Sequence, residues 1–392
     1  MAEPQSFLDG RVTLYVGDCN AMLGAMEADS VDCVVTSPPY WGLRDYGVDG
    51  QIGLEPTLGE HLTVMVHVFD AVCRVLKPTG TCFINYGDCY ATSPNGRSAA
   101  DTKATGNDDR TFRDKPFSTI GGVLKAKDLC MVPNRLAIAL QEAGWWVRSE
   151  IIWAKPNPMP ESIRDRPATS HEKIFMLTKS ARYWYDGEAV RQPSAETSLG
   201  RWAQDVESQE GSHRANGGAK TNGTMKAVGG PRGRTTYGRH TLDDNVPVGE
   251  RRGKIRAADV AAPRHAGHIN HTKLDETLRG FGRNLRNYEP APVDVWPIAT
   301  QPFSDAHFAT FPPELAERCI LAGCPKGGLV LDPFGGAGTT ALVALRHHRR
   351  AALIELNPAY AEMARTRIET EWRVPAKPKA IDHGPLFGGE AA

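Results

Sequence analysis

A short proline segment, Ser37-Pro38-Pro39-Tyr40, carries the first side chains that could do chemistry. Two consecutive prolines fix the backbone and remove two N–H donors, so carbonyl oxygens and the Ser37 hydroxyl are left to meet a ligand. The segment follows an apolar stretch, and open α/β sheets bind ligands at the carboxyl ends of their strands. We therefore predict an acceptor-rich pocket, although a rigid turn that packs its aromatic ring into the core is the simpler reading of Pro-Pro-Tyr alone.

A glycine-rich segment, residues 332–340 (Asp-Pro-Phe-Gly-Gly-Ala-Gly-Thr-Thr), joins an apolar stretch to a helical one. Glycines at a helix N-terminus let backbone N–H groups approach a ligand closely. Glu355 ends the next predicted strand, where a carboxylate can accept hydrogen bonds from two ribose hydroxyls. This predicts a nucleotide-like ligand. The glycine spacing also fits a nicotinamide or flavin site, whereas no Lys follows the glycines as a phosphate-binding P-loop requires.

Alternating strand and helix patterns must position these two segments. The alternation predicts an α/β fold with a mostly parallel sheet, and a helical stretch separates the first two strands. Predicted strands cover residues 12–16, 32–35, 81–85, 145–153, 172–177, 328–331 and 351–354, and predicted helices cover residues 61–76, 129–144, 312–320, 339–347 and 358–371.

Three regions interrupt this pattern. Residues 91–120 are polar and lack periodicity, which predicts a long mobile loop. Residues 191–290 hold 17 Lys or Arg against 11 Asp or Glu, a net charge of +6 in a chain whose formal net charge is zero. Composition alone favours a disordered, solvated insert there, and a basic DNA-facing module is the alternative. Residues 374–392 are rich in Pro and Gly, which predicts a disordered tail.

Composition excludes several classes of protein. The 392 residues are 41% hydrophobic and contain no apolar run of about 18 residues, so we expect a soluble globular protein without a membrane partner. The first ten residues lack the pattern of a secretory signal, which predicts a cytoplasmic protein. The eight cysteines occur singly, without a Cys-x-x-Cys pair, so we expect reduced core residues and no metal site.

Two motifs together identify a family resemblance. Residues 35–40 (Val-Thr-Ser-Pro-Pro-Tyr) resemble the catalytic motif of the DNA amino-methyltransferases, and residues 332–340 resemble their S-adenosylmethionine (SAM) motif. The catalytic motif comes first and the SAM motif last, which resembles the β group of that family. Residues 17–18, 308–315 and 354–358 are similar to further family segments. The family usually has Ser where this chain has Ala337. The resemblance covers the chain except residues 91–120, residues 191–290 and the tail.

The resemblance implies a doubly wound, mostly parallel SAM-methyltransferase sheet with an inserted basic target-recognition region. Residues 1–190 would form the catalytic half, residues 191–290 the target-recognition region and residues 291–373 the SAM-binding half. The implied cofactor is SAM. Its implied binding residues are Asp18, Asp332, Phe334, Gly336, Gly338, Thr339, Thr340 and Glu355.

The implied reaction is direct attack by an exocyclic amine of a flipped base in double-stranded DNA. The catalytic segment is Ser37, Pro38, Pro39 and Tyr40: the Ser37 hydroxyl and the Pro38 carbonyl would accept the amine N–H bonds, and Tyr40 would stack on the base. No cysteine follows a proline, which argues against a covalent intermediate.

In this family a Ser before the Pro-Pro pair is typical of enzymes that methylate cytosine N4, whereas Asp or Asn is typical of adenine-N6 enzymes. We therefore expect N4-methylcytosine, with adenine N6 as the alternative. A nicotinamide-dependent oxidoreductase is a remote alternative that leaves the Ser-Pro-Pro-Tyr segment without a role. Besides double-stranded DNA, the resemblance is compatible with a homodimer and with a cognate restriction endonuclease as partners.

Overall fold

The computed structural model describes residues 3–43, 45, 47–92, 117–190, 293–301 and 311–373. Most of the predicted loop at residues 91–120, all of the predicted basic region at residues 191–290, and the tail at residues 374–392 lie outside these residues and stay predictions. The chain divides into one unit of Met1–Asp186 with Asp294–Ala392 and a second of Gly187–Val293. Every element described below belongs to the first unit except where stated.

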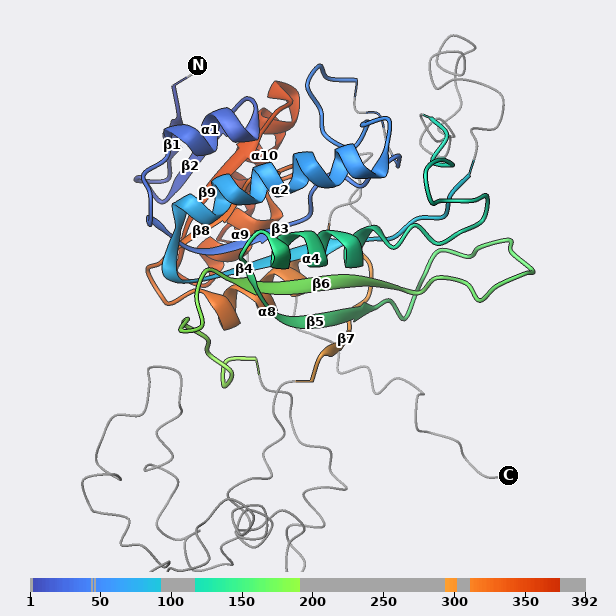
Figure 1. The fold of residues 1–392 in the computed structure, drawn as a ribbon. Helices are drawn as coiled ribbons and strands as arrows, with labels where there is room; N and C mark the ends of the chain where they lie inside the picture. The colour runs from blue at the N-terminus through green and yellow to red at the C-terminus, as the bar shows by residue number, and fades with distance from the viewer. Residues whose placement is uncertain are drawn as a thin grey trace, which may run out of the picture. The chain divides into compact units, whose positions relative to one another are not determined.

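Within the described residues, a nine-stranded sheet has the order β1-β2-β9-β8-β3-β4-β6-β5-β7 (Figure 1). Strands β2, β9, β8, β3 and β4 run parallel to their neighbours in this series, and β5 runs parallel to β7. Strand β1 is antiparallel to β2, and β6 is antiparallel to both β4 and β5. The mostly parallel α/β sheet is thus confirmed. The strands are β1 (Gln5–Phe7), β2 (Val12–Val16), β3 (Val31–Thr36), β4 (Leu76–Tyr86), β5 (Trp146–Ala154), β6 (His171–Thr178), β7 (Val295–Pro297), β8 (Leu329–Asp332) and β9 (Arg350–Glu355).

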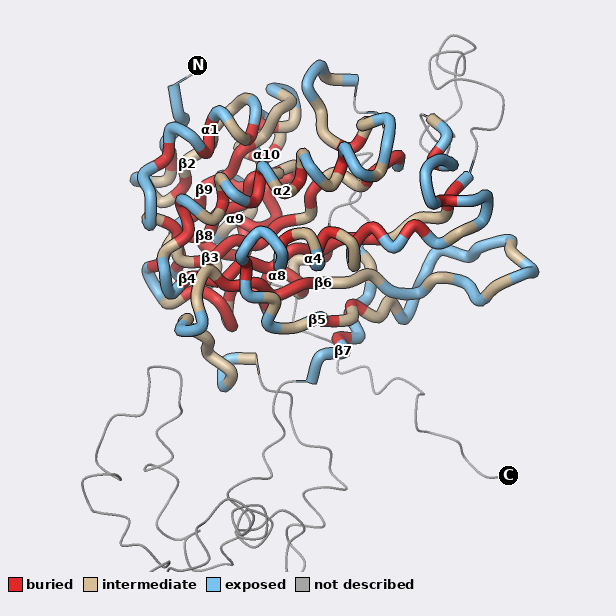
Figure 2. The backbone as a smooth tube through the Cα atoms, viewed as in Figure 1, coloured by how far each residue is buried: buried red, intermediate tan, exposed pale blue. Residues whose placement is uncertain are grey.

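Helices cover both faces of the sheet, as a doubly wound fold requires. One layer holds α1, α2 and α4, and the other holds α8, α9 and α10 (Figure 1). Buried residues follow the central strands and the inner helix faces (Figure 2). The helices are α1 (Cys19–Ala25), α2 (Leu58–Val75), α4 (Val132–Glu142), α8 (Pro313–Gly323), α9 (Thr339–Arg346) and α10 (Pro358–Glu371).

Helix α2 was predicted from its sequence pattern, whereas the start of the strand that follows it was predicted too late. Thr57 and Glu60 form a reciprocal capping box at its N-terminus, and its buried side chains recur at helical spacing. Strand β4 begins at Leu76, directly after the helix, rather than after a break at residues 77–80. Its pairing with β3 shifts register between Val31 and Cys33, an irregularity that leaves room for Pro78 in the strand.

None of the eight cysteines forms a disulfide, and six of them are buried, as predicted for reduced core residues. Burial raises the pKa of the Cys19 thiol to about 12, so this thiol stays protonated at neutral pH. Among the described residues, no helix combines the length and the apolar character that a bilayer crossing requires. In the same part of the chain, no cluster of three or more His, Cys, Asp or Glu side chains is arranged to hold a metal ion.

Candidate active site

The two motifs meet at the carboxyl ends of adjacent parallel strands. Strand β3 leads into the Ser-Pro-Pro-Tyr segment, and its neighbour β8 ends at Asp332, where the glycine-rich loop begins. The Thr36 hydroxyl donates to Asp332 Oδ1 over 2.6 Å, and the Thr340 hydroxyl donates to Oδ2 over 2.7 Å. Asp332 therefore ties the catalytic strand to the first turn of α9, across almost 300 residues of sequence.

Asp332 is fully enclosed, and burial raises its pKa to about 7 in spite of the hydrogen bonds from Thr36 and Thr340. An unfolded aspartate has a pKa of about 3.9. Between these two values the folded chain binds a proton that the unfolded chain lacks. This carboxyl group therefore stabilises the fold fully below about pH 4, and the contribution disappears as pH rises through 7.

Replacing Asp332 by Asn tests this linkage. The amide stays uncharged and keeps an oxygen for Thr36, so the variant lacks the proton uptake. The free energy of unfolding of the wild type, relative to Asp332→Asn, should fall by on the order of a few kcal/mol between pH 4 and pH 7. Chemical denaturation of both proteins across this pH range measures the difference. A difference that stays constant with pH would show that the carboxyl group has its ordinary pKa.

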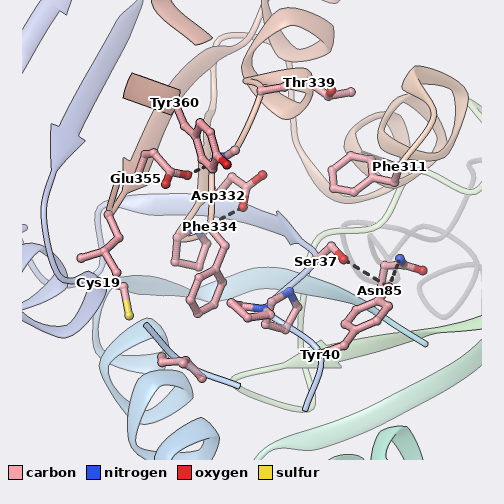
Figure 3. A pocket seen from close by; sticks show the side chains of 18 of the residues that line it. Cys19, Ser37, Tyr40, Asn85, Phe311, Asp332, Phe334, Thr339, Glu355 and Tyr360 are labelled. Carbon is pink, nitrogen blue, oxygen red and sulfur yellow. Dashed lines mark hydrogen bonds between the residues drawn. The ribbon is translucent and has the colours of Figure 1, made fainter. Parts of the chain in front are cut away.

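One cavity of about 540 Å³ opens at this edge of the sheet and contains both motifs (Figure 3). Residues from the carboxyl ends of β2, β3, β4, β8 and β9 line it, together with residues near β5 and at the start of β6. Of the residues singled out from the sequence, those that line the cavity are Asp18, Ser37, Pro38, Pro39, Tyr40, Asp332, Phe334, Gly336, Thr339 and Glu355.

The cofactor side of the cavity gathers around Glu355 at the end of β9. Its carboxylate accepts from the backbone N–H of Gly336 (2.8 Å) and of Asn357 (2.9 Å), and burial raises its pKa. The backbone N–H of Gly17 donates to the Glu355 carbonyl (2.9 Å), which places Asp18 beside it. Carboxylates, backbone amides and the Phe334 ring are the groups that suit ribose hydroxyls, a charged amino-acid end and an adenine. The residues present therefore fit SAM.

Gly338 and Thr340 lie behind the cavity wall rather than on it. Gly338 has a φ of 74°, and a Cβ atom there would come within 2.9 Å of the Ile368 side chain on α10. Thr340 is fully buried, and its hydroxyl is engaged by Asp332. The structure thus shows that both residues have a packing position, one against α10 and one beneath the loop, and their contact with the cofactor stays a prediction.

The catalytic side of the cavity holds a hydrogen-bond network that ends on a carboxylate. The Tyr40 hydroxyl donates to Glu172 Oε2 (2.8 Å) and accepts from the Ser37 hydroxyl (3.3 Å) and from Asn85 Nδ2 (3.0 Å) (Figure 3). Asn85 Nδ2 also donates to Glu172 Oε2 (2.9 Å), and Lys155 pairs with Glu172 Oε1. Burial and the charge of Glu172 raise the pKa of Tyr40, so its hydroxyl stays a donor.

Sequence reasoning missed Asn85, Glu172 and Lys155. Asn85 is a polar residue near the end of an apolar strand, a signal that could have singled it out. Lys155 directly follows β5 and Glu172 lies at the start of β6, and the antiparallel register brings the start of β6 to the carboxyl end of β4. Nothing in the local pattern predicts that reversal.

A second buried hydrogen-bond network holds the backbone of the Ser-Pro-Pro-Tyr segment. The Tyr86 hydroxyl accepts from the backbone N–H of Trp41 (3.0 Å) and donates to the Pro39 carbonyl (3.2 Å). His61, which is fully buried, contacts the Tyr86 hydroxyl through Nε2 and Glu55 through Nδ1, both at 2.8 Å. The backbone on both sides of Tyr40 is therefore anchored to α2 and β4.

Comparison with known proteins gives a consistent result. A model of a DNA methylase family matches residues 31–366. The type II methyltransferase M.Cfr9I of Citrobacter freundii is 38% identical over 359 residues, which cover 92% of this chain and 88% of that protein. The type II methyltransferase M.SmaI of Serratia marcescens is 36% identical over 355 residues, with 91% and 90% covered.

Among solved structures, the cytosine-N4-specific PvuII DNA methyltransferase superposes with a TM-score of 0.51 at 16% identity, covering 91% of this chain and 86% of that one. This likeness shows the fold. The resemblance inferred from the two motifs is thereby confirmed, and the nicotinamide-dependent alternative is left without support. The chain belongs to the DNA methylase family of amino-methyltransferases and uses SAM as its cofactor.

Proposed function

We propose that this enzyme methylates the N4 amine of cytosine in double-stranded DNA. The observation that carries the proposal is the place of Ser37, which precedes the Pro-Pro pair and lines the same cavity as Glu355 and the glycine-rich loop. A Ser at this position is typical of cytosine-N4 enzymes in the family. A carboxylate, as found in adenine-N6 enzymes, would be a stronger, charge-assisted acceptor.

The side chains of the cavity suit attack by an amine. An exocyclic amine is a poor nucleophile because its lone pair is delocalised into the ring. The Ser37 hydroxyl donates its hydrogen bond to Tyr40, so its lone pairs can accept one amine N–H, and the Pro38 carbonyl can accept the other. Such preorganised contacts favour a pyramidal nitrogen and are worth roughly 10²–10³ in rate each. Bound SAM supplies an activated methyl group, and no covalent enzyme–base bond is required.

Access to this cavity requires that the base leave the helix. One face of the Tyr40 ring already stacks on Tyr86, with 4.7 Å between ring centroids and 27° between the planes. A flipped base would stack on the opposite face, a contact worth about 1–3 kcal/mol in single-strand complexes.

Mass spectrometry tests the choice of base. Unmethylated DNA is incubated with the enzyme and SAM and digested to nucleosides, while modification-sensitive sequencing of the same DNA gives the recognition sequence. The expected product is N4-methylcytosine. Finding N6-methyladenine in its place would overturn the cytosine assignment and leave the family and the cofactor unchanged.

We also propose that residues 191–290, with a net charge of +6, form the target-recognition region, and that their basic side chains hold the DNA by its phosphates. The densest basic run there is Arg251, Arg252, Lys254 and Arg256. Replacing these four by Gln should weaken DNA binding and flatten its salt dependence, because each lost phosphate contact removes a slope of about 0.9 in a log–log plot. Filter binding at several salt concentrations measures the slope. An unchanged slope would place the DNA contacts elsewhere.

A further inference from the structure

The side chain of Asn85 carries an acceptor that the protein itself does not use. Asn85 is only 3% exposed and lines the cavity on its catalytic side. Its Nδ2 donates both hydrogens, to Tyr40 and to Glu172. Its Oδ1 is buried and has no hydrogen-bond partner among the described residues. Buried polar atoms are nearly always paired, so an unpaired oxygen in a binding cavity points to a donor on the ligand.

The orientation of this amide is set by its neighbours. Glu172 is a carboxylate and can only accept, and Lys155 holds its other oxygen. Tyr40 has one hydroxyl hydrogen, which goes to Glu172, and its oxygen accepts from Ser37 and Asn85. A flipped amide would turn its oxygen toward two oxygens with no hydrogen to offer. The Tyr40 hydroxyl and Asn85 Nδ2 therefore both donate to Glu172, and Asn85 Oδ1 is left as an acceptor.

We propose that Asn85 Oδ1 accepts a hydrogen bond from the exocyclic amine of the target base, and that Glu172 is the positioning residue that fixes this polarity. The inference rests on the proposed function. The amine is the group on the base edge of cytosine and adenine that donates, whereas guanine and thymine present an oxygen at the corresponding place. Asn85 would therefore select amino bases over oxo bases.

This contact also serves the transfer step. Three acceptor oxygens would then lie near the two amine N–H bonds: the Ser37 hydroxyl, the Pro38 carbonyl and Asn85 Oδ1. An acceptor then stays on the amine while its nitrogen becomes pyramidal and gains positive charge. The charge would be lost when the methylated nitrogen releases one proton to solvent, after the sulfur–methyl bond of SAM has broken and left S-adenosylhomocysteine.

The test removes the amine from the DNA and the acceptor from the protein. Duplexes carry the target base or its analogue without the amine, 2-pyrimidinone for cytosine or purine for adenine, at the site found by sequencing. Affinities are measured with S-adenosylhomocysteine present. Amine removal should weaken binding by the wild type about three- to tenfold more than binding by Asn85→Ala. Asn134→Ala, which changes an amide on α4 outside the cavity, should behave as the wild type.

A second variant leaves the Asn85 side chain in place, so its result does not depend on the space that Asn85→Ala creates. In Glu172→Gln, Lys155 retains the amide oxygen, and the amide nitrogen faces Asn85. The Asn85 oxygen then turns to accept from that nitrogen, so the cavity meets a donor. This variant should therefore bind the duplex with the amine no more tightly than the duplex without it. S-adenosylhomocysteine affinity, which should be unchanged, verifies that each variant is folded.

The outcomes separate the two proposals. Equal sensitivity to the amine in the wild type, Asn85→Ala and Glu172→Gln, with methylated base still produced by the wild type, overturns the role of Asn85 alone. Absence of any methylated exocyclic amine in the mass-spectrometric assay overturns the proposed function, and the role of Asn85 falls with it.

Discussion

Replacing Ser37 by Ala should lower kcat by about 10²–10³-fold while the Kd for SAM stays nearly unchanged. The hydroxyl lies on the catalytic side of the cavity, donates a hydrogen bond to Tyr40 and presents its lone pairs to the amine. Its hydrogen bond goes to Tyr40, away from Glu355. Single-turnover methyl transfer measures the chemical step, and isothermal titration calorimetry measures cofactor affinity.

Ser30→Ala is the matched control, because Ser30 precedes the same strand and its hydroxyl donates to the Glu27 carbonyl, away from the cavity. Its kcat should equal that of the wild type. A fall of less than about tenfold in Ser37→Ala, against the size expected for a preorganised acceptor, would remove Ser37 from the chemical step. Loss of SAM binding in the same variant would move it to the cofactor side.

Replacing Glu355 by Ala should have the opposite signature: the Kd for SAM rises about 10- to 100-fold, and kcat at saturating SAM changes little. Hydrogen bonds to a charged group contribute about 1.5–3 kcal/mol, and the ribose hydroxyls would lose this acceptor. The Gly336 and Asn357 amides lose their anchor as well. Calorimetry with SAM and steady-state kinetics at saturating DNA separate the two parameters.

Glu142→Ala, which removes an exposed carboxylate from α4, is the control and should bind SAM as the wild type does. Glu355→Gln keeps one acceptor oxygen and should lie between Glu355→Ala and the wild type. If Glu355→Ala binds SAM normally, Glu355 serves only to fasten the glycine-rich loop, and the ribose is held by other groups.

Periodicity in the sequence predicted most of the sheet because its central strands are buried on both faces and its helices are amphipathic. The strand at residues 12–16 and the helix at residues 358–371 were predicted with the bounds that the structure shows. The short strands β1 and β7 were missed, since three residues are too few to show a period. The direction of β6 was also missed, because strand polarity depends on connections and not on local pattern.

The candidate site was predictable where chemistry is concentrated in short motifs. Ser37 and Glu355 lie in segments whose types and order are informative by themselves. Glu172 and Lys155 reach the site through contacts between strands that are far apart in the chain, and no local signal reports such contacts. Asn85 differs from them, because a polar residue near the end of an apolar strand could have been singled out. For Gly338 the glycine motif predicts a cofactor contact, which stays a prediction, and the structure adds that a Cβ atom there would press on Ile368 of α10.

The bond from Thr36 to Asp332 also bears on how genes for such enzymes can be arranged. The motifs are neighbours because β3 and β8 are adjacent, whatever their order along the chain. The first and last described segments of the first unit also lie close together, since the Arg11 guanidinium lies 4.2 Å from the centre of the Trp372 ring. A circularly permuted gene, joined at these ends and opened within residues 191–292, would preserve every described strand pairing and encode the SAM motif first. The geometry of the site therefore leaves the order of the two motifs along the chain free to vary.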